Sequence, residues 1–149
     1  MVLASNKRAF FDYEILERFT AGIVLSGAEV KTIKKGRADM SGSFASIDGG
    51  EAWLKNMHVP LYGPARRNYI DYDTDANRKL LLSKKELEHI ATKTHEKGIS
   101  LIPLKLHSNH GLVKVELGLA KGKKKADKRE TIKKRDFDRK RDRLMKGNY

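Results

Sequence analysis

The five histidines, at positions 58, 89, 95, 107 and 110, are the side chains best suited to acid–base or metal chemistry. His107 and His110 are three residues apart, so they could share a metal ion or act as an acid–base pair. No neighbouring carboxylate or third ligand completes either arrangement. The absence of cysteine also excludes disulfides, thiolate zinc sites and cysteine nucleophiles. We therefore expect no enzyme, no metal and no other cofactor. A nuclease that uses the two histidines is the enzymatic alternative.

The segment 118–123, GLAKGK, has a faint similarity to a phosphate-binding loop. It is one residue too short, and Lys124 and Lys125 follow where such a loop needs the Ser or Thr that binds Mg²⁺. It also follows a predicted strand into a basic segment rather than opening an apolar helix. The pattern therefore does not indicate a nucleotide-hydrolysing enzyme.

Basic residues are concentrated at the C-terminal end of the chain. The 149 residues carry a net charge of +13, and residues 121–149 hold fourteen of the 32 Lys and Arg but five of the 19 acids. Subtraction gives this segment a charge of +9 and the other 120 residues a charge of +4. Clustered Lys and Arg bind phosphates and release counterions, so RNA is the expected partner.

The segment 121–149 has too few apolar side chains to pack against the rest of the chain: only Ile132, Phe137, Leu144 and Met145. Lys, Arg and Glu favour a helix, but a helix without a core is marginal alone and forms on a partner. We predict two parts, a folded domain over 1–120 and a basic tail over 121–149 that is disordered alone and helical when bound. A solvated tail that only aids solubility is the alternative.

Hydrophobic periodicity predicts mostly strands in the first half of the chain. A strand is expected from residue 9, with Phe11, Tyr13, Ile15 and Phe19 on one face, and it bends at 20–22 before ending near 25. Ser26 and Glu29 form a capping box that opens a helix over 27–35. Residues 43–47 and 52–59 predict a hairpin around Asp48-Gly49-Gly50, and we expect Trp53 in its second strand to lie in the core.

The second half continues in the same way. A long loop over 60–77 precedes a strand at 78–82, and a second capping box, Ser83 with Glu86, opens a helix that Gly98 should end. A strand over 99–106 should lie at a sheet edge because of Pro103, and 107–111 should form a turn. In the last strand, 112–120, the residues expected to point inward are Val113, Val115, Leu117 and Leu119.

These patterns predict a mainly β fold: a small antiparallel OB-like β-barrel with two or three flanking helices, over residues 1–120. No apolar run reaches the ~20 residues that span a membrane, and the first residues lack the order of a signal peptide. We therefore expect a cytoplasmic protein with no membrane partner.

Basic and aromatic residues are also distributed over the barrel. Asn6, Lys7 and Arg8 precede the first predicted strand, Lys31 lies on the first helix, and Arg78 and Lys79 begin a later strand. Lys and Arg bind phosphate oxygens, Asn contacts base or sugar edges, and tyrosine rings stack on unpaired bases. Together with the basic tail, these residues indicate an RNA-binding protein.

Several motifs occur in the order seen in the SmpB family, the SsrA-binding proteins of bacterial trans-translation. They are Asn6-Lys7-Arg8-Ala9, Tyr13, Ala21-Gly22, Gly27 with Glu29-Val30-Lys31, Arg78 to Leu82, Gly118 to Lys124, Asp127-Lys128-Arg129 and Leu144-Met145-Lys146. The resemblance covers nearly the whole chain. It implies an OB-like barrel that binds the tRNA-like domain of transfer-messenger RNA (tmRNA).

The resemblance also implies partners and a sequence of events. The complex with tmRNA enters stalled ribosomes with elongation factor Tu, translation resumes on the tagging frame, and the ribosome is released. The tail would sense the decoding centre and the empty mRNA channel, both lined by small-subunit ribosomal RNA. We expect the protein itself to be a monomer.

Site residues follow from the matching motifs. The resemblance implies that the tRNA-like domain is contacted by Asn6, Lys7, Arg8, Tyr13, Thr20, Lys31, Arg78, Lys79, Leu81 and Lys114. It implies that the ribosome is contacted by Lys121, Lys123, Lys124, Asp127, Lys128, Arg129, Leu144, Met145 and Lys146.

The chain departs from the family pattern at two positions. Thr20 replaces a Glu that precedes the Ala-Gly pair, and a hydroxyl retains only part of the hydrogen bonding of a carboxylate. Ala126 replaces a His or Tyr before Asp127 and removes a ring able to stack on a base. We expect a Glu at position 20 to tighten RNA binding. A general RNA-binding ribosomal protein or RNA chaperone, which needs only the charge, is the alternative function.

Overall fold

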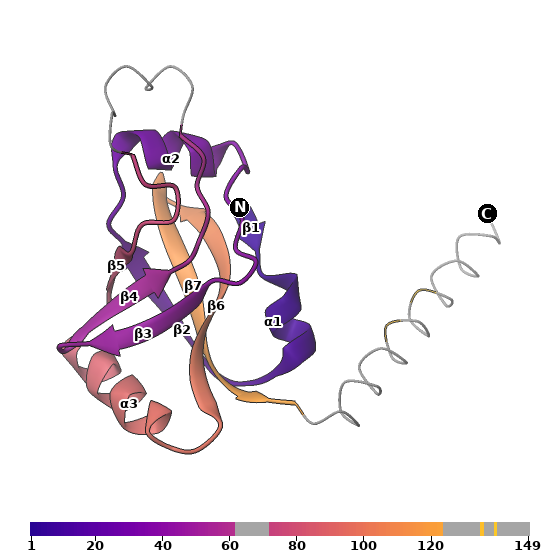
Figure 1. Cartoon of the computed structure of the whole chain (residues 1–149), viewed down its shortest axis with the longest axis vertical. Coiled ribbons are helices and arrows are strands. Elements are labelled where there is room, and N and C mark those ends of the chain that lie inside the picture. The colour runs from indigo at the N-terminus through magenta and orange to yellow at the C-terminus, as the bar shows by residue number, and fades with distance from the viewer. Residues whose placement is uncertain (62–71, 124–134, 136–138, 140–149) are drawn as a thin grey trace.

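The computed structural model describes residues 1–61, 72–123, 135 and 139 and shows, within them, an antiparallel sheet flanked by helices (Figure 1). The strands are β1 (Val2–Ser5), β2 (Tyr13–Ile23), β3 (Phe44–Asp48), β4 (Glu51–Lys55), β5 (Arg78–Leu81), β6 (Ile99–Asn109) and β7 (Leu112–Gly122). The helices are α1 (Lys7–Asp12), α2 (Gly27–Lys34) and α3 (Lys84–Thr94). The predicted mainly β fold is confirmed.

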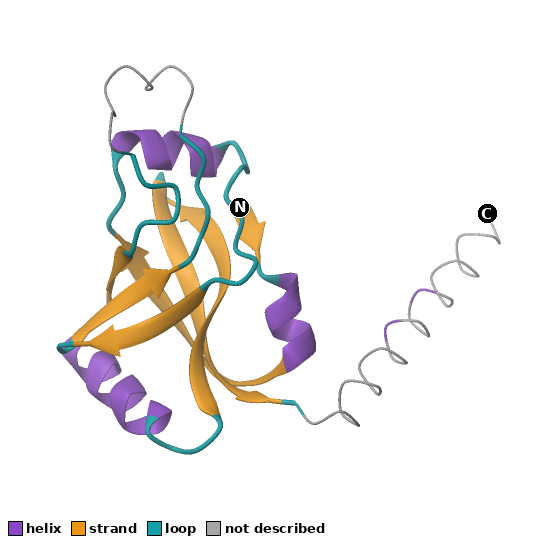
Figure 2. Ribbon diagram, viewed as in Figure 1, coloured by secondary structure: helices purple, strands orange, loops and turns teal. Residues whose placement is uncertain are grey.

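The sheet curls into a small barrel, as predicted. Its strand order is β1-β6-β7-β2-β5-β4-β3, and β3 at one end comes round against β6 (Figure 2). Side chains from both halves fill the interior, among them Leu54, Leu106, Val115 and Leu117, each with no exposed surface. Burial of these apolar groups is the main stabilising contribution to the fold. None of the helices in the described ranges is both long and apolar enough to cross a membrane.

β2 and β7 have eleven residues each and pair along most of their length, with one register shift between Ile15 and Glu17. Tyr13 lies opposite Gly122 at one end, and Gly22 lies opposite Lys114 nine residues later. At ~3.3 Å per residue the two positions are up to about 30 Å apart along the strand. Residues near Tyr13 at one end of this strand pair therefore lie far from residues near Gly22 at the other end.

The two predicted capping boxes are confirmed. Ser26 Oγ accepts from the backbone N–H of Glu29, and the Glu29 carboxylate accepts from the N–H of Ser26; Ser83 and Glu86 do the same at α3. The prediction that Gly98 ends the second helix is wrong, because α3 ends at Thr94. Gly98, with a φ of 85°, lies in the turn before β6.

The start of the chain differs from the prediction. Residues 7–12 form α1 instead of the beginning of a strand, and β1 was not predicted. A tertiary contact explains the change, since the Asn6 backbone N–H donates to Leu104 O at 2.8 Å and its Nδ2 donates to Pro103 O at 3.0 Å. These bonds hold Asn6 against β6, and the following turn of helix buries Ala9.

The hairpin of β3 and β4 is confirmed, although β4 ends at Lys55 rather than at residue 59. The predicted core position of Trp53 is wrong. Ala52 and Leu54 point inward and are 1% and 0% exposed, so Trp53 between them lies on the outer face and is half-buried. Its cross-strand neighbours there are Ser46 and Lys79.

β6 is longer than predicted and is not an edge strand. It continues through Asn109, so the turn consists only of His110 and Gly111, with φ values of 50° and 78°. β1 pairs with β6 between residues 105 and 107, and β7 pairs along its other side. Pro103 lies outside the β1 pairing, where its missing N–H costs no ladder bond.

Two predictions fall partly outside the described residues: the loop over 60–77, of which 62–71 are not described, and the tail. β7 continues through Gly122, two residues beyond the predicted domain boundary. The division into a folded domain and a tail stays a prediction.

Candidate nucleic-acid interface

The predicted site residues of the barrel divide into two groups at opposite ends of β2. Asn6, Lys7, Arg8 and Tyr13 form what we call the α1 end. Thr20, Leu81 and Lys114 lie near the other end, where Gly22 pairs with both β5 and β7. The structure therefore does not bring all the predicted residues together into one surface.

At the α1 end, side chains with different exposure lie close in sequence. Asn6 is 6% exposed and is bonded to β6, whereas Lys7 and Arg8 are exposed. Arg8 Nε donates to the Asp12 carboxylate at 3.1 Å, and the Arg8 side chain is 78% exposed. Tyr13 is half-buried and packs beside Ala9. Asn6 thus positions the backbone, and Lys7 and Arg8 supply the accessible charge.

Lys123, near the start of the predicted tail, contacts the α1 end. The Lys123 backbone N–H donates to Asp12 O at 2.9 Å, and its Nζ donates to Phe10 O at 3.2 Å. Lys121 is exposed, and the Arg135 guanidinium carbon lies 5.5 Å from the centroid of the Phe11 ring. The remaining predicted ribosome contacts, Lys124, Asp127, Lys128, Arg129, Leu144, Met145 and Lys146, lie outside the described residues.

At the other end, four residues form a row across four neighbouring strands, which we call the Leu81 row. In the register of the sheet, Leu81 of β5 lies opposite Gly22 of β2, Gly22 opposite Lys114 of β7, and Lys114 opposite His107 of β6. Leu81 is 52% exposed. A Cβ on Gly22 would lie 3.3 Å from the Leu81 Cβ, so the missing side chain lets Leu81 lie close over the strand.

Beside the row, Thr20 lies opposite Glu116. The Glu116 carboxylate accepts from Arg18 Nη1 at 2.8 Å and pairs with Lys105 Nζ at 3.1 Å. Burial raises the pKa of the Glu116 carboxyl, but the hydrogen bonds from Arg18 and Lys105 outweigh it and hold the pKa below its usual value. The position across from Thr20 therefore carries an ionised carboxylate at neutral pH.

Arg78 is buried in the structure, although it was predicted to contact RNA at the surface. It is 3% exposed, pairs through Nε with the Glu29 carboxylate, and donates to Met57 O at 2.7 Å and Thr74 O at 3.1 Å. A guanidinium held in this way links α2 to β5 and does not face solvent. Its neighbour Lys79 does reach the surface, where it pairs with Glu51 at 3.1 Å.

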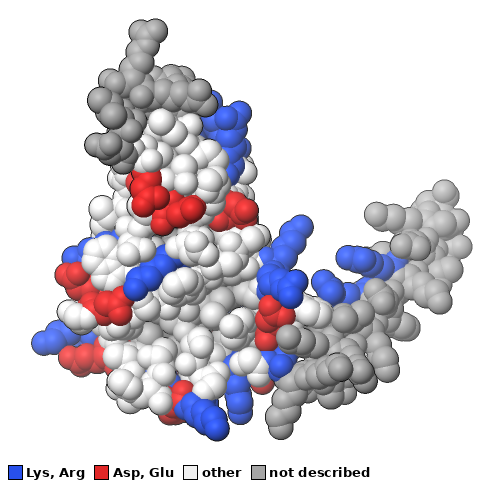
Figure 3. All heavy atoms as spheres, viewed as in Figure 1, with Lys and Arg blue, Asp and Glu red and all other residues white. Residues whose placement is uncertain are grey.

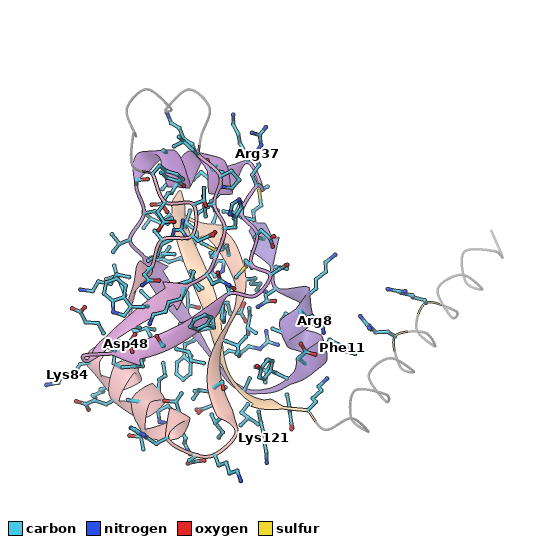
Figure 4. The ribbon with its side chains drawn as sticks, in the orientation of Figure 1. Arg8, Phe11, Arg37, Asp48, Lys84 and Lys121 are labelled. Carbon is cyan, nitrogen blue, oxygen red and sulfur yellow. The ribbon has the colours of Figure 1, made fainter. Side chains whose placement is uncertain are left out.

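Lys31 is exposed on α2, the helix that follows the Leu81-row end of β2. Figure 4 shows Arg37, also exposed, just beyond the end of this helix. On the face shown in Figure 3, Lys and Arg side chains gather beside α1 and at the end of α2, whereas both charges alternate around the β3–β4 hairpin. The barrel therefore offers cationic surface at the α1 end and at the end of α2 (Figure 3).

Sequence reasoning missed two residues near the Leu81 row. His107 had been weighed only as a catalytic or metal-binding residue, whereas it lies opposite Lys114. Glu116 was not among the predicted site residues, because its position across from Thr20 follows only from the register of β2 and β7. In the described ranges no group of three or more His, Asp or Glu side chains could hold a metal ion.

The fold and its charged surfaces define an OB-like β-barrel protein whose last residues, 121–149, carry most of the net positive charge. The chain belongs to the SmpB family, because the family model for SmpB protein matches residues 3–147.

Known relatives agree with this assignment. The chain is 46% identical to the SsrA-binding protein of Ligilactobacillus salivarius, over 99% of this chain and 93% of that protein. It is 50% identical to that of Geobacter sulfurreducens, over 93% and 89%. Among solved structures it resembles a chain from "tmRNA-SmpB: a journey to the center of the bacterial ribosome", with a TM-score of 0.68, 42% identity, and coverage of 89% of this chain and 95% of that one.

Proposed function

We propose that this protein is an RNA-binding adaptor that binds the tRNA-like domain of tmRNA and delivers it to stalled ribosomes. Trans-translation then tags the nascent peptide and rescues the ribosome. The observation that carries the proposal is the nearly full-length similarity to proteins named for SsrA binding, together with a solved tmRNA-SmpB relative. The protein acts without catalysis and in the bacterial cytosol.

The Leu81 row supports a role in RNA binding on physical grounds. An exposed leucine beside Gly22 provides a flat apolar surface for a sugar or base, and Lys114 provides the charge for a neighbouring phosphate. We assign the row, with Thr20, Lys79 and Lys31 around it, to the tRNA-like domain. Arg78 contributes by supporting β5 and α2 rather than by touching RNA.

The α1 end and the tail complete the proposal. Lys7, Arg8 and Tyr13 add a second RNA contact, and the tail residues Lys121 to Lys146 enter the decoding centre and the vacant mRNA channel. A cationic segment suits a channel lined by RNA, because its charges replace counterions along the phosphates. The protein functions as a monomer, and elongation factor Tu accompanies the complex.

A competition experiment tests this function. Labelled tRNA-like domain is bound to the full-length protein at fixed salt and displaced by unlabelled tRNA-like domain or by an ordinary elongator tRNA. We expect the ordinary tRNA to compete at least tenfold less well. Equal competition by both RNAs would instead support a general RNA-binding protein, whose affinity comes mostly from phosphate contacts.

A further inference from the structure

The barrel has a cavity of about 250 Å³ at the α1 end, where β3 comes round against β6. Residues of four elements line it: Asn6 and Arg8 at α1, Tyr13 of β2, Phe44 of β3 and Ile102 of β6. The cavity therefore lies where the curled sheet meets itself and where α1 covers the join.

Part of the cavity wall is apolar and buried. Ala9 is 3% exposed and Ile102 is 7% exposed. The two buried polar side chains nearby are already bonded, because Asn6 Nδ2 donates to Pro103 O at 3.0 Å and Ser43 Oγ donates to Met40 O at 2.6 Å. Asp12, the acidic residue of the lining, accepts from Arg8 Nε through Oδ2. The apolar part of the wall favours a ligand that presents an apolar, flat surface.

Aromatic rings stand at two sides of the opening. Phe44 is 46% exposed although it belongs to a strand, and Tyr13 is half-buried on the neighbouring side. Phe44 points outward because Ala45 and Ile47, which share the opposite face of β3, pack against the core. An exposed phenyl ring at the edge of a cavity is a surface on which a planar ring can stack.

The surroundings of the opening are cationic. Arg8 on α1 is bonded to Asp12 through Nε, and its side chain is 78% exposed (Figure 4). Lys7 and Lys121 are also exposed at this end. Stacking surface and phosphate-binding charge thus occur together, the combination with which proteins hold unpaired nucleotides.

We propose that the cavity receives one unpaired nucleobase of the bound RNA. The base stacks on Phe44 and rests against Ile102, and Arg8 contacts its phosphate. The proposal rests on the function proposed above and specifies what the α1 end recognises: a nucleotide displaced from its stack rather than duplex backbone.

The test uses full-length protein and a labelled six-nucleotide single-stranded RNA. Phe44→Ala should weaken its binding about tenfold or more, because stacking of one base is lost, whereas Phe44→Trp should retain it. Phe10→Ala is the matched control, since Phe10 is a 38% exposed phenylalanine on α1 that does not line the cavity. It should leave the affinity unchanged, and thermal melting establishes that each variant is folded.

Two further probes identify the ligand. A six-unit RNA backbone without bases should bind weakly and equally to the wild type and to Phe44→Ala. AMP and GMP should bind far more weakly than the hexamer; equal affinity for them would overturn the assignment to RNA in favour of a free nucleotide.

The outcomes for the cavity and for the proposed function are separable. If the wild type binds the tRNA-like domain selectively but Phe44→Ala and Phe10→Ala bind the hexamer alike, the cavity assignment is wrong and the adaptor function stands. If the wild type shows no selectivity for the tRNA-like domain while Phe44→Ala still loses hexamer binding, the adaptor function is wrong and the cavity assignment stands.

Discussion

The α1 end and the Leu81 row position their polar residues in different ways. In the Leu81 row, four strands in regular register place Leu81, Gly22, Lys114 and His107 side by side. At the α1 end, the positions depend on one turn of helix, on the bonds from Asn6 to β6, and on irregular register in β2 between Ile15 and Glu17.

This difference has consequences for how each end responds to substitution. A ladder is held by many backbone hydrogen bonds, so an outward side chain of the Leu81 row can be changed with little effect on its neighbours. The α1 end relies on few tertiary contacts, so one buried substitution should alter the whole group. The two ends should therefore separate in experiments that measure stability and binding together.

Removal of the tail should produce the largest effect. The cut belongs after Lys123, because β7 runs through Gly122 and Lys123 bonds to Asp12. We expect peptide tagging on stalled ribosomes to be abolished, with the dissociation constant for the tRNA-like domain rising only a few-fold. Tagging assays and filter binding measure the two quantities. Persistent tagging would show that the tail is dispensable and that the barrel alone serves both roles.

Arg78→Ala should cause the largest loss of stability. It leaves the Glu29 carboxylate and two backbone carbonyls without their donor, and breaking a buried pair costs ~3–5 kcal/mol. Chemical denaturation measures this loss. Lys79→Ala removes the same charge from the adjacent, partly exposed position and should cost less than ~1 kcal/mol. If both variants unfold at the same denaturant concentration, Arg78 has no structural role.

Asn6→Ala should act on the α1 end alone. The Pro103 carbonyl loses its buried donor, which costs ~1–3 kcal/mol. Hydrogen exchange should accelerate in α1 while amides of β5 and of β2 near Gly22 keep their protection. Ser5→Ala, an exposed change one residue earlier, serves as the control. Uniform acceleration through the barrel would mean that the two ends are not independent.

Leu81→Ala should weaken binding without unfolding the protein. Leu81 is half exposed, so its truncation should change stability by less than ~1 kcal/mol, while lost contact with RNA should cost ~1–2 kcal/mol of binding free energy. Calorimetry and binding to the tRNA-like domain measure both. Leu112→Ala, at an exposed leucine outside the row, is the comparison variant; a similar loss of affinity there would mean that the row has no special role.

Thr20→Glu should have the smallest effect. The family pattern predicts tighter RNA binding, but the new carboxylate would lie opposite Glu116, and like charges across a ladder are unfavourable. We expect the gain in affinity to stay within a few-fold and to grow when Glu116→Gln is added. Binding measured for the two single variants and the double variant gives the coupling directly. Strict additivity would show that Glu116 does not influence position 20.

Local patterns predicted most of the regular elements. The capping boxes at Ser26 and Ser83 and the turn at Asp48 to Gly50 are encoded by residues near one another in sequence, and each was found as predicted. Alternation in the last strand also identified its four inward residues, from Val113 to Leu119, correctly.

The errors occurred where distant contacts decide the structure. The alternating pattern that includes Phe11 and Tyr13 led to a predicted strand from residue 9, but Asn6 bonds to β6 and the chain forms a helix over residues 7–12 instead. Trp53 was expected inside from its residue type, whereas the pleat that buries Ala52 and Leu54 turns it outward. The division of the site residues between two ends could not be predicted either, since it follows from the pairing of β2 with β7.

The same pairing sets a mechanical property of the molecule. Because β2 and β7 pair from Tyr13 opposite Gly122 to Gly22 opposite Lys114, the distance between the two ends of this ladder cannot change without breaking several of its hydrogen bonds. The barrel therefore holds the α1 end and the Leu81 row at a fixed separation. Two ligand features can be held at once only if their separation matches this span, so length itself becomes a criterion of recognition.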